Sequence, residues 1–361
     1  MFRILRGFAR SRSGSMMPLF LVMLMPLIAA VGFSVDYTSA VQTKSNQQQA
    51  LDAAILTITT MDTTATLSQR QTMLQDSFIA NGGQGSATLT NFVGGTATAA
   101  TTARATASFA MPTVFMTIAR IDTVPIAVAS AVSKPPALVK ADFKVTGVSG
   151  YWNKTMTLYG TQFGAAPPAK PLMTIAYVYG GTGDPKGYGT TTASILTTDS
   201  TGKTVSTVAQ TQVCKLAGSN PPAGAVIQTD KFQTRFYCVD TMYPANGTGA
   251  SIDVSQMGGL SLQMHVPSGN PQDLKTNDPL TSNRLYSGVK DPQTGTVTYN
   301  ETATGQVVDI FGLVPCGSTA YQAWEDGGNP VPAPVGNADF FYNVTGKCDF
   351  NKRPSDTALT Q

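Results

Sequence analysis

An uncharged apolar stretch at residues 16–35 constrains this chain more than any other feature of its sequence. A helix rises ~1.5 Å per residue, so about 20 residues span ~30 Å, which matches the hydrocarbon thickness of a bilayer. We therefore predict a transmembrane helix over residues 16–35. Pro26 lies near its middle and removes one helical hydrogen bond, which predicts a kink there.

Charged residues flank this stretch asymmetrically. Four arginines, among them Arg10 and Arg12, precede it, whereas the first acidic residue, Asp36, follows directly after it. Because basic residues are retained on the cytoplasmic side, we predict a cytoplasmic tail over residues 1–15 and export of the remainder. A cleaved signal peptide is the alternative. The apolar run is long for a signal peptide, however, and a small-residue cleavage site is hard to find.

The composition of the remainder limits both fold and function. Charged residues make up 12% of the chain, about half the usual share. Without the four N-terminal arginines, 20 basic side chains face 21 acidic ones. No basic cluster follows residue 12, so we expect no nucleic-acid binding. A chain rich in Thr, with Glu only at Glu301 and Glu325, favours strands and turns over long helices.

Hydrophobic periodicity predicts an α+β fold in several parts. Residues 36–62 form an amphipathic stalk helix, because Leu51, Ala54, Ile55 and Ile58 recur at helical spacing. That apolar stripe packs either on the chain's own domain or on a neighbouring subunit. The parts that follow are a small α+β module (63–136), a mainly β, sandwich-like extracytoplasmic domain (137–350) and a flexible tail (351–361).

The small module has a predicted order of elements. A helix over residues 66–80 ends at an Asn-Gly-Gly cap, and partly alternating Thr/Ala/Val runs then predict strands. These strands cover residues 86–92, 96–109 and 124–132, with a short helix over residues 112–121 that begins at a proline.

Four cysteines lie in the C-terminal half of the chain, and no two have the spacing of a metal-binding knuckle. An even number in an exported segment predicts two disulfides. Three pairings are possible; we favour the two local ones, and four buried free thiols are the alternative. The residues are Cys214, Cys238, Cys316 and Cys348.

No catalytic constellation emerges from the sequence. His265, the single histidine, lies on the polar face of a predicted strand over residues 260–266. Glu301 and Glu325 are too isolated to form an acid–base pair. Gly202-Lys203-Thr204 lacks the first glycine of a phosphate-binding loop, because Thr197 stands there. We therefore expect no enzymatic activity, no cofactor and no metal.

Aromatic residues suggest one alternative function. Tyr151, Trp152 and Trp324 lie beside Thr- and Asn-rich loops and could form a stacking surface for sugars. The protein would then be an exported adhesin or a glycan-binding β domain. Packing of these aromatic residues in the core is the simpler interpretation.

Three motifs follow one another near the N-terminus. Arg12-Ser13-Gly14 precedes the apolar run, Asp36-Tyr37 marks its outer end, and a Gln/Ala-rich stretch leads to Asp52-Ala53-Ala54. Asp36 and Tyr37 suit this place, since a carboxylate prefers water and a phenol the membrane interface. Together the motifs resemble the N-terminal module of the TadE/TadG-like pilus-assembly proteins of the Flp (tight adherence) system.

This resemblance implies a single-pass protein of the bacterial inner membrane, with a cytoplasmic N-terminus and a periplasmic body. Its partners would be other Flp pilus-assembly proteins or pilins, which it would contact without catalysing a reaction. The residues that we expect at topology or interface positions are Arg10, Arg12, Gly14, Pro26, Asp36, Tyr37, Leu51, Asp52 and Ile55.

Two departures from the family pattern narrow this expectation. Relatives that a prepilin peptidase cleaves carry Glu five residues after the glycine, but Leu19 stands at that offset from Gly14. We therefore expect the anchor to be retained. Larger relatives contain a von Willebrand type A domain with an Asp-x-Ser-x-Ser metal motif. The nearest approaches, at residues 199–203 and 253–257, lack its last oxygen ligand, so we expect no such metal site.

Overall fold

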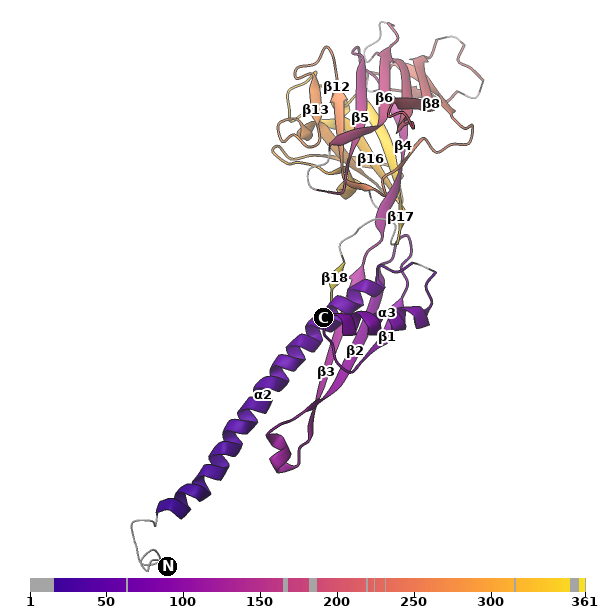
Figure 1. The fold of residues 1–361 in the computed structure, drawn as a ribbon. Coiled ribbons are helices and arrows are strands. Elements are labelled where there is room, and N and C mark those ends of the chain that lie inside the picture. The colour runs from indigo at the N-terminus through magenta and orange to yellow at the C-terminus, as the bar shows by residue number, and fades with distance from the viewer. Residues whose placement is uncertain are drawn as a thin grey trace, which may run out of the picture. The chain divides into compact units, whose positions relative to one another are not determined.

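The chain folds into two compact units in a computed structural model (Figure 1). The structure describes residues 16–62, 64–164, 168–181, 187–218, 220–223, 225–230, 232–314, 316–350 and 357–360. Unit 1 consists of Met1–Gly95, Ala100–Pro135 and Ser355–Gln361; unit 2 consists of Thr96–Ala99 and Pro136–Pro354. A long apolar helix, one shorter α-helix and a mostly β remainder confirm the predicted α+β fold.

Unit 1 begins with a single helix of 43 residues, α2 (Met16–Ile58). The predicted membrane segment and the predicted stalk are the two halves of this helix. Its C-terminal end is held by Arg70, whose guanidinium donates to the carbonyls of Ile58 and Asp62 at 2.7 Å each. Because the last carbonyls of a helix lack partners within it, a cation placed there stabilises the helix end.

The second helix of unit 1, α3 (Leu67–Ala80), has a clear local cause. Thr66 accepts from the backbone N–H of Gln69, and the Gln69 side chain accepts from the N–H of Thr66, which forms a capping box. The helix ends at Asn81. These bounds agree with the predicted helix over residues 66–80.

The sheet of unit 1 has the antiparallel order β1-β2-β3-β18 among the described residues. Alternation along β2 decides which face is buried, because Ala103, Ala105 and Ala107 point inward while the intervening Thr and Arg side chains are exposed. The strands are β1 (Ser86–Val93), β2 (Thr101–Pro112), β3 (Thr123–Lys134) and β18 (Ala358–Leu359).

Two elements of unit 1 differ from expectation. The predicted helix over residues 112–121 shrinks to a four-residue 3-10 helix, η2 (Met116–Ala119), because β2 continues to Pro112. The C-terminal tail, predicted to be flexible, contributes β18, which pairs with β3 at Val132 and Ser133. Residues 351–356 and 361 of that tail lie outside the described residues.

The core of unit 1 lies between α2, α3 and one face of the sheet. Small alanines on the sheet and on α2 let the helix approach closely, and a few larger side chains fill the remaining space. The fully buried members from α2 and α3 are Leu51, Ala54, Ile55, Ile58, Leu74 and Phe78.

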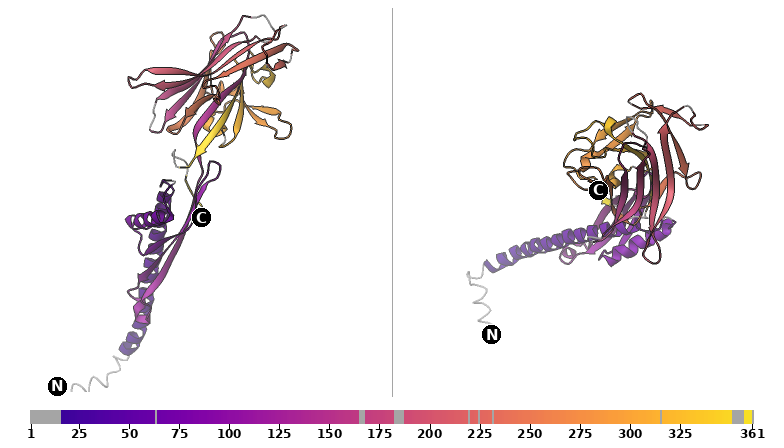
Figure 2. Two further views of the ribbon diagram at one scale, coloured as in Figure 1. Left: turned by 90° about the vertical axis from the view of Figure 1, so that its right-hand side faces the viewer. Right: turned by 90° about the horizontal axis from the view of Figure 1, so that it is seen from above.

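Unit 2 contains two antiparallel sheets, as expected for a sandwich-like domain (Figures 1 and 2). Among the described residues one sheet has eight strands, in the order β13-β12-β5-β6-β7-β8-β10-β9, and the other has six, in the order β11-β4-β17-β16-β14-β15. Side chains from both sheets, such as Leu158 and Leu262 from one and Phe143 and Phe340 from the other, share one core.

The bounds of the unit 2 strands are β4 (Ala137–Val148), β5 (Lys154–Gln162), β6 (Ala169–Tyr179), β7 (Gly189–Thr198), β8 (Thr204–Leu216), β9 (Ile227–Thr229), β10 (Arg235–Met242), β11 (Ala250–Asp253), β12 (Met257–His265), β13 (Asp273–Lys275), β14 (Leu285–Lys290), β15 (Val297–Glu301), β16 (Thr319–Trp324) and β17 (Phe340–Asp349). Short 3-10 helices connect some of them, namely η3 (Ser282–Arg284), η4 (Ile310–Leu313) and η5 (Val335–Asn337).

Candidate functional site

The N-terminal half of α2 exposes apolar side chains along its length. In the part of the chain that the structure describes, α2 is the one helix long and apolar enough to cross a membrane. A core helix of a soluble protein would bury such a surface, but here it is largely uncovered. The exposed residues are Met17, Phe20, Leu21, Val22, Met23, Met25, Leu27, Ile28 and Val31.

Asp36 ends this apolar half and holds a loop of the sheet against the helix. Its two carboxylate oxygens accept hydrogen bonds from three successive backbone N–H groups, those of Val114 (3.1 Å), Phe115 (2.8 Å) and Met116 (2.6 Å). The Asp36 side chain is only 3% exposed as a result. A carboxylate with three backbone donors is well compensated for its loss of water. Asp36 therefore fixes the turn between β2 and β3 on α2.

One turn earlier along the helix, Gly32 gives the same loop room to pack. A Cβ added at Gly32 would lie 2.6 Å from the Cβ of Phe115, which is closer than side-chain atoms approach. The absence of a side chain thus allows Phe115 to lie directly on the helix backbone. Gly32 and Asp36 occupy the same face of α2, since they are four residues apart.

The remaining part of α2 contacts the sheet through polar groups as well as through its apolar stripe. Gln48 donates from Nε2 to the Ala129 carbonyl and to Asp52 Oδ1, at 2.9 Å each. At the end of the helix, Lys134 Nζ donates to the Thr59 carbonyl at 3.4 Å. Burial lowers the pKa of the Lys134 ammonium. These contacts lock the register of the β2–β3 hairpin along the helix.

The residues predicted at topology or interface positions differ in how exposed they are. Tyr37 is 68% exposed beside Asp36, and Pro26 lies exposed within the continuous helix; its kink stays a prediction. Asp52 is half-buried. Leu51 and Ile55 have no exposed surface, so the stripe packs on the chain's own module and the neighbouring-subunit alternative does not hold for these two side chains. Arg10, Arg12 and Gly14 lie outside the described residues.

Sequence reasoning missed the loop that Asp36 binds. Residues 113–119 contain no charged side chain, which is unusual for a turn between two strands and was the available signal. The pairing itself joins residues about 80 positions apart, and no local pattern reveals such a contact.

The cysteines form the two local pairs, Cys214–Cys238 and Cys316–Cys348. Cys214 and Cys238 are direct cross-strand partners on β8 and β10. Cys348 on β17 binds Cys316, which precedes β16. Both bonds therefore reinforce contacts between neighbouring segments of unit 2.

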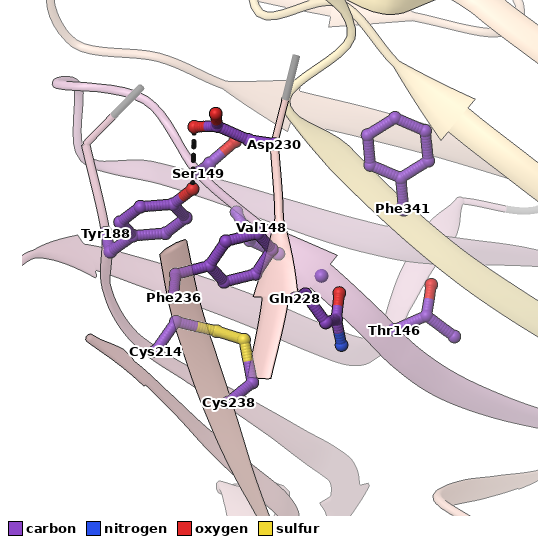
Figure 3. A pocket seen from close by; sticks show the side chains of 11 residues that line it. Thr146, Val148, Ser149, Tyr188, Cys214, Gln228, Asp230, Phe236, Cys238 and Phe341 are labelled. Carbon is purple, nitrogen blue, oxygen red and sulfur yellow. Dashed lines mark hydrogen bonds between the residues drawn. A yellow bond between two sulfur atoms is a disulfide. The ribbon is translucent and has the colours of Figure 1, made fainter. Parts of the chain in front are cut away.

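The first disulfide also lines a cavity of about 290 Å³ in unit 2 (Figure 3). Tyr188 stacks on Phe236 with ring centroids 4.7 Å apart, and its hydroxyl donates to Asp230 at 3.1 Å. An aromatic wall with a few polar groups can bind a small polar ligand. The other lining residues are Thr146, Gly147, Val148, Ser149, Gln228 and Phe341.

The remaining candidates for chemistry have structural roles. His265 Nδ1 lies 2.8 Å from an Asp273 carboxylate oxygen in an exposed cross-strand pair of β12 and β13, and this hydrogen bond lowers the pKa of the Asp273 carboxyl. Glu325 is buried against Arg284, whereas Glu301 is exposed on β15. In the described part of the chain, no group of three His, Cys, Asp or Glu side chains could hold a metal ion.

The alternative of a sugar-stacking surface formed by Tyr151, Trp152 and Trp324 does not hold for Trp324. Trp324 is fully buried and donates from Nε1 to the Tyr342 hydroxyl at 3.2 Å, so it belongs to the core. Trp152 packs partly buried against the same core, and Tyr151 remains 49% exposed beside Tyr179. The sequence could not separate these roles, because core and surface aromatics look alike without their neighbours.

Comparison with known families identifies the N-terminal module. Residues 14–57 match the family described as putative Flp pilus-assembly TadE/G-like, and this confirms the resemblance that the motifs at Gly14, Asp36-Tyr37 and Asp52 carried. The match coincides with almost all of α2. Comparison with curated proteins and with solved structures gives no significant match. The match supports a part for this chain in Flp pilus assembly.

Proposed function

We propose that this chain is a non-enzymatic, TadG-like component of Flp pilus assembly that is anchored in the bacterial inner membrane by α2. Its N-terminus lies in the cytoplasm, and its body lies in the periplasm, where it contacts pilins or other assembly proteins. The observation that carries this proposal is the coincidence of the family match at residues 14–57 with a helix that is exposed and apolar in its first half.

Two further features support this topology. Arginines occur before the apolar stretch and no basic residue follows it until Lys44, a pattern that retains the N-terminus in the cytoplasm. Both disulfides lie in unit 2, and structural disulfides form in oxidising compartments such as the periplasm. A retained anchor agrees with Leu19 at the position where processed relatives carry Glu.

Membrane fractionation with N-terminal sequencing tests the retained anchor. We expect full-length protein that resists extraction from membranes at alkaline pH. A mature chain that begins near residue 40 and is recovered in soluble fractions would contradict the proposal and favour an exported binding protein.

Cysteine labelling tests the orientation. Every native cysteine is in a disulfide, so an added cysteine is the one free thiol. Leu280→Cys, at an 83% exposed position of unit 2, should react with a membrane-impermeant maleimide in cells whose outer membrane is permeable. Ser13→Cys in the N-terminal tail should react only after the inner membrane is opened. The reverse pattern would contradict the topology.

Complementation tests the part in pilus assembly. Deletion of the gene should abolish or strongly reduce piliation, and the wild-type chain should restore it. A chain whose residues 16–35 are replaced by an unrelated membrane helix separates anchoring from specific helix contacts. Normal pili in the deletion strain would refute the proposed function.

A further inference from the structure

The turn between β2 and β3 exposes apolar side chains in an unusual concentration. We call residues 113–122 the tip loop. Val114 is 72% exposed, Ile118 71% and Ile121 46%, and the first seven residues of the loop carry no charge. Single exposed apolar residues are common on protein surfaces. Several on one short loop indicate instead that the loop contacts another apolar surface.

The β2–β3 hairpin lies along α2 from the end of the helix down to the predicted membrane segment (Figure 2). β3 has 12 residues, which span ~40 Å at ~3.3 Å per residue. The part of α2 from Gly32 to Ile58 spans ~39 Å at ~1.5 Å per residue. The two lengths match, so a hairpin that starts beside Thr59 ends beside Gly32.

Contacts along the helix fix this register at successive levels. Lys134 binds the Thr59 carbonyl at the upper end, and Gln48 binds Ala129 in the middle. Asp36 binds three N–H groups of the tip loop, and Gly32 packs on Phe115 below it. The tip loop is therefore the part of the sheet that lies lowest along α2.

These contacts also set the depth of the tip loop relative to a bilayer. The uncharged segment of α2 extends to residue 35, and Asp36 is the first group that needs water or hydrogen-bond donors. Gly32 lies four residues before Asp36, which is ~6 Å deeper along the helix axis. Phe115 packs at the level of Gly32, so the loop that carries it lies at the level of the last turn of the membrane segment.

We propose that the tip loop inserts its apolar side chains Val114 and Ile118 into the interfacial region of the bilayer, on the side where α2 emerges. This inference rests on the proposed membrane anchoring. Lipid is the occupant that the structure favours, because the exposed loop continues the apolar surface of α2 at the same depth. Arg120, which is exposed in the same loop directly after η2, is placed to meet lipid phosphates.

A second contact with the membrane has a mechanical consequence for unit 1. One transmembrane helix leaves its domain free to rotate about the helix axis. A loop beside the helix that also enters the interface fixes this rotation, so the sheet presents one defined face to proteins in the membrane plane.

Depth-dependent fluorescence quenching tests the proposal with the full-length, oxidised protein in vesicles of phosphatidylcholine and phosphatidylglycerol. An environment-sensitive nitrobenzoxadiazole label is attached to Ile118→Cys. Met25→Cys, on the exposed face of the membrane helix, is the control for anchoring. Leu67→Cys is the control for an exposed apolar residue far from the membrane; it lies in the first turn of α3, whose Arg70 binds the upper end of α2.

We expect blue-shifted emission at Ile118 and stronger quenching by nitroxides placed near the headgroups than by nitroxides deep in the acyl chains. The Met25 label should be quenched by the deep nitroxides, and the Leu67 label by neither. If Met25 is quenched while Ile118 behaves like Leu67, the anchor stands and the tip-loop proposal is overturned. If Met25 is not quenched either, the anchoring fails and the tip-loop proposal fails with it.

A second measurement separates lipid from a protein occupant. A blue-shifted Ile118 label that no lipid nitroxide quenches would show that protein covers the loop, which overturns the proposal. Conversely, Ile118→Asp should reduce the quenching of a label at Val114→Cys. Ile79→Asp, a charge added at an exposed position of α3, should leave that quenching unchanged.

Discussion

The two units of this chain stabilise themselves by different means. Unit 1 packs a long helix onto a sheet through small side chains, with Ala54 on α2 and alanines such as Ala105 on β2 in one core, and it contains no cysteine. Unit 2 encloses large aromatic residues, among them Trp324 and Phe340, between two sheets and carries both disulfides. Unit 1 thus depends on the correct placement of α2, whereas the core of unit 2 is formed by residues of unit 2 alone.

The two units therefore separate dependence on a long helix, in unit 1, from a self-contained core, in unit 2. The geometry of unit 1 follows from one helix and its register against a hairpin, so small changes on α2 affect it directly. Unit 2 has its core and covalent links within itself, so it tolerates changes on α2. The predictions below test whether each unit responds to perturbation independently of the other.

Loss of both disulfides should produce the largest effect, and only in unit 2. Each bond closes a loop of 24 or 32 residues, which corresponds to about 3.5 kcal/mol of stability per bond by the loop-entropy relation. Cys→Ser at all four positions, or reduction, should lower the free energy of unfolding of unit 2 by that order. Pulse proteolysis measures it; equal destabilisation of unit 1 would contradict the independence of the units.

The buried ion pair of unit 2 should come next. Lys154 Nζ lies 2.5 Å from Asp326 and 3.8 Å from Asp339, and its side chain is fully buried. Lys154→Met leaves buried carboxylates without their cation, which should cost about 3–5 kcal/mol. Adding Asp326→Asn should recover part of this loss. Lys215→Met, at an exposed position, is the matched control in urea unfolding and should change little.

A cavity on α2 should destabilise unit 1 alone. Leu51→Ala removes a fully buried side chain from the helix–sheet core, and we expect a loss of about 2–5 kcal/mol. Val41→Ala, on the exposed side of the same helix, is the control. Hydrogen exchange measured by mass spectrometry should show faster exchange in α3 and β1–β3 while unit 2 stays protected. Loss of protection in unit 2 would show that the units are coupled.

Acid should weaken unit 2 through Asp142. This carboxylate is buried, which opposes its ionisation, but hydrogen bonds from Ser251, Lys347 and Thr248 outweigh that effect and lower its pKa. Because the folded-state pKa is lowered, the stabilisation is present above the unfolded-state pKa of about 3.9 and is lost as pH falls through the folded-state value.

Urea unfolding of the wild type and of Asp142→Asn at pH values from 6 down to 2 measures this contribution. The difference between the two proteins should shrink as the pH falls. A difference that stays constant over this range would show that Asp142 acts by its shape and not by its charge.

The smallest and most local effect should follow from Asp36→Ala. This change removes the acceptor of the N–H groups of Val114, Phe115 and Met116. We expect faster hydrogen exchange at these amides while the core amides of β2 and β3 keep their protection. Asp36→Asn, which keeps an acceptor oxygen, should have a weaker effect. Unchanged exchange in both variants would show that packing on Gly32 alone holds the loop.

The sequence permitted much of this fold to be predicted, because several of its determinants are local. Helical spacing located the buried stripe of α2 around Leu51 and Ile55, and the Asn-Gly-Gly cap located the end of α3. The charge-free run located the exposed, apolar half of α2. The alternation of strand residues predicted a mainly β domain, although not the order of its strands in two sheets.

The missed features all depend on contacts between distant residues. Asp36 looked like a residue that faces water at the membrane surface, but it binds a loop of the sheet. Lys154 and Asp326 are 172 positions apart and carry no pattern that connects them. Core packing was the simpler interpretation for Trp324, but its partner Tyr342, on a neighbouring strand, could not be named from the sequence. None of these three contacts can be recognised before the fold is known.

The place of β18 in the sheet of unit 1 determines the order in which the protein can be completed. α2 and residues 358–359 belong to the same unit, although the whole segment Pro136–Pro354 of unit 2 lies between them in the sequence. During synthesis the outer edge of β3 at Val132 and Ser133 therefore stays open until unit 2 has been made and β18 follows. An open strand edge can pair with another chain, so β18 covers a part of β3 that would otherwise be available for such pairing.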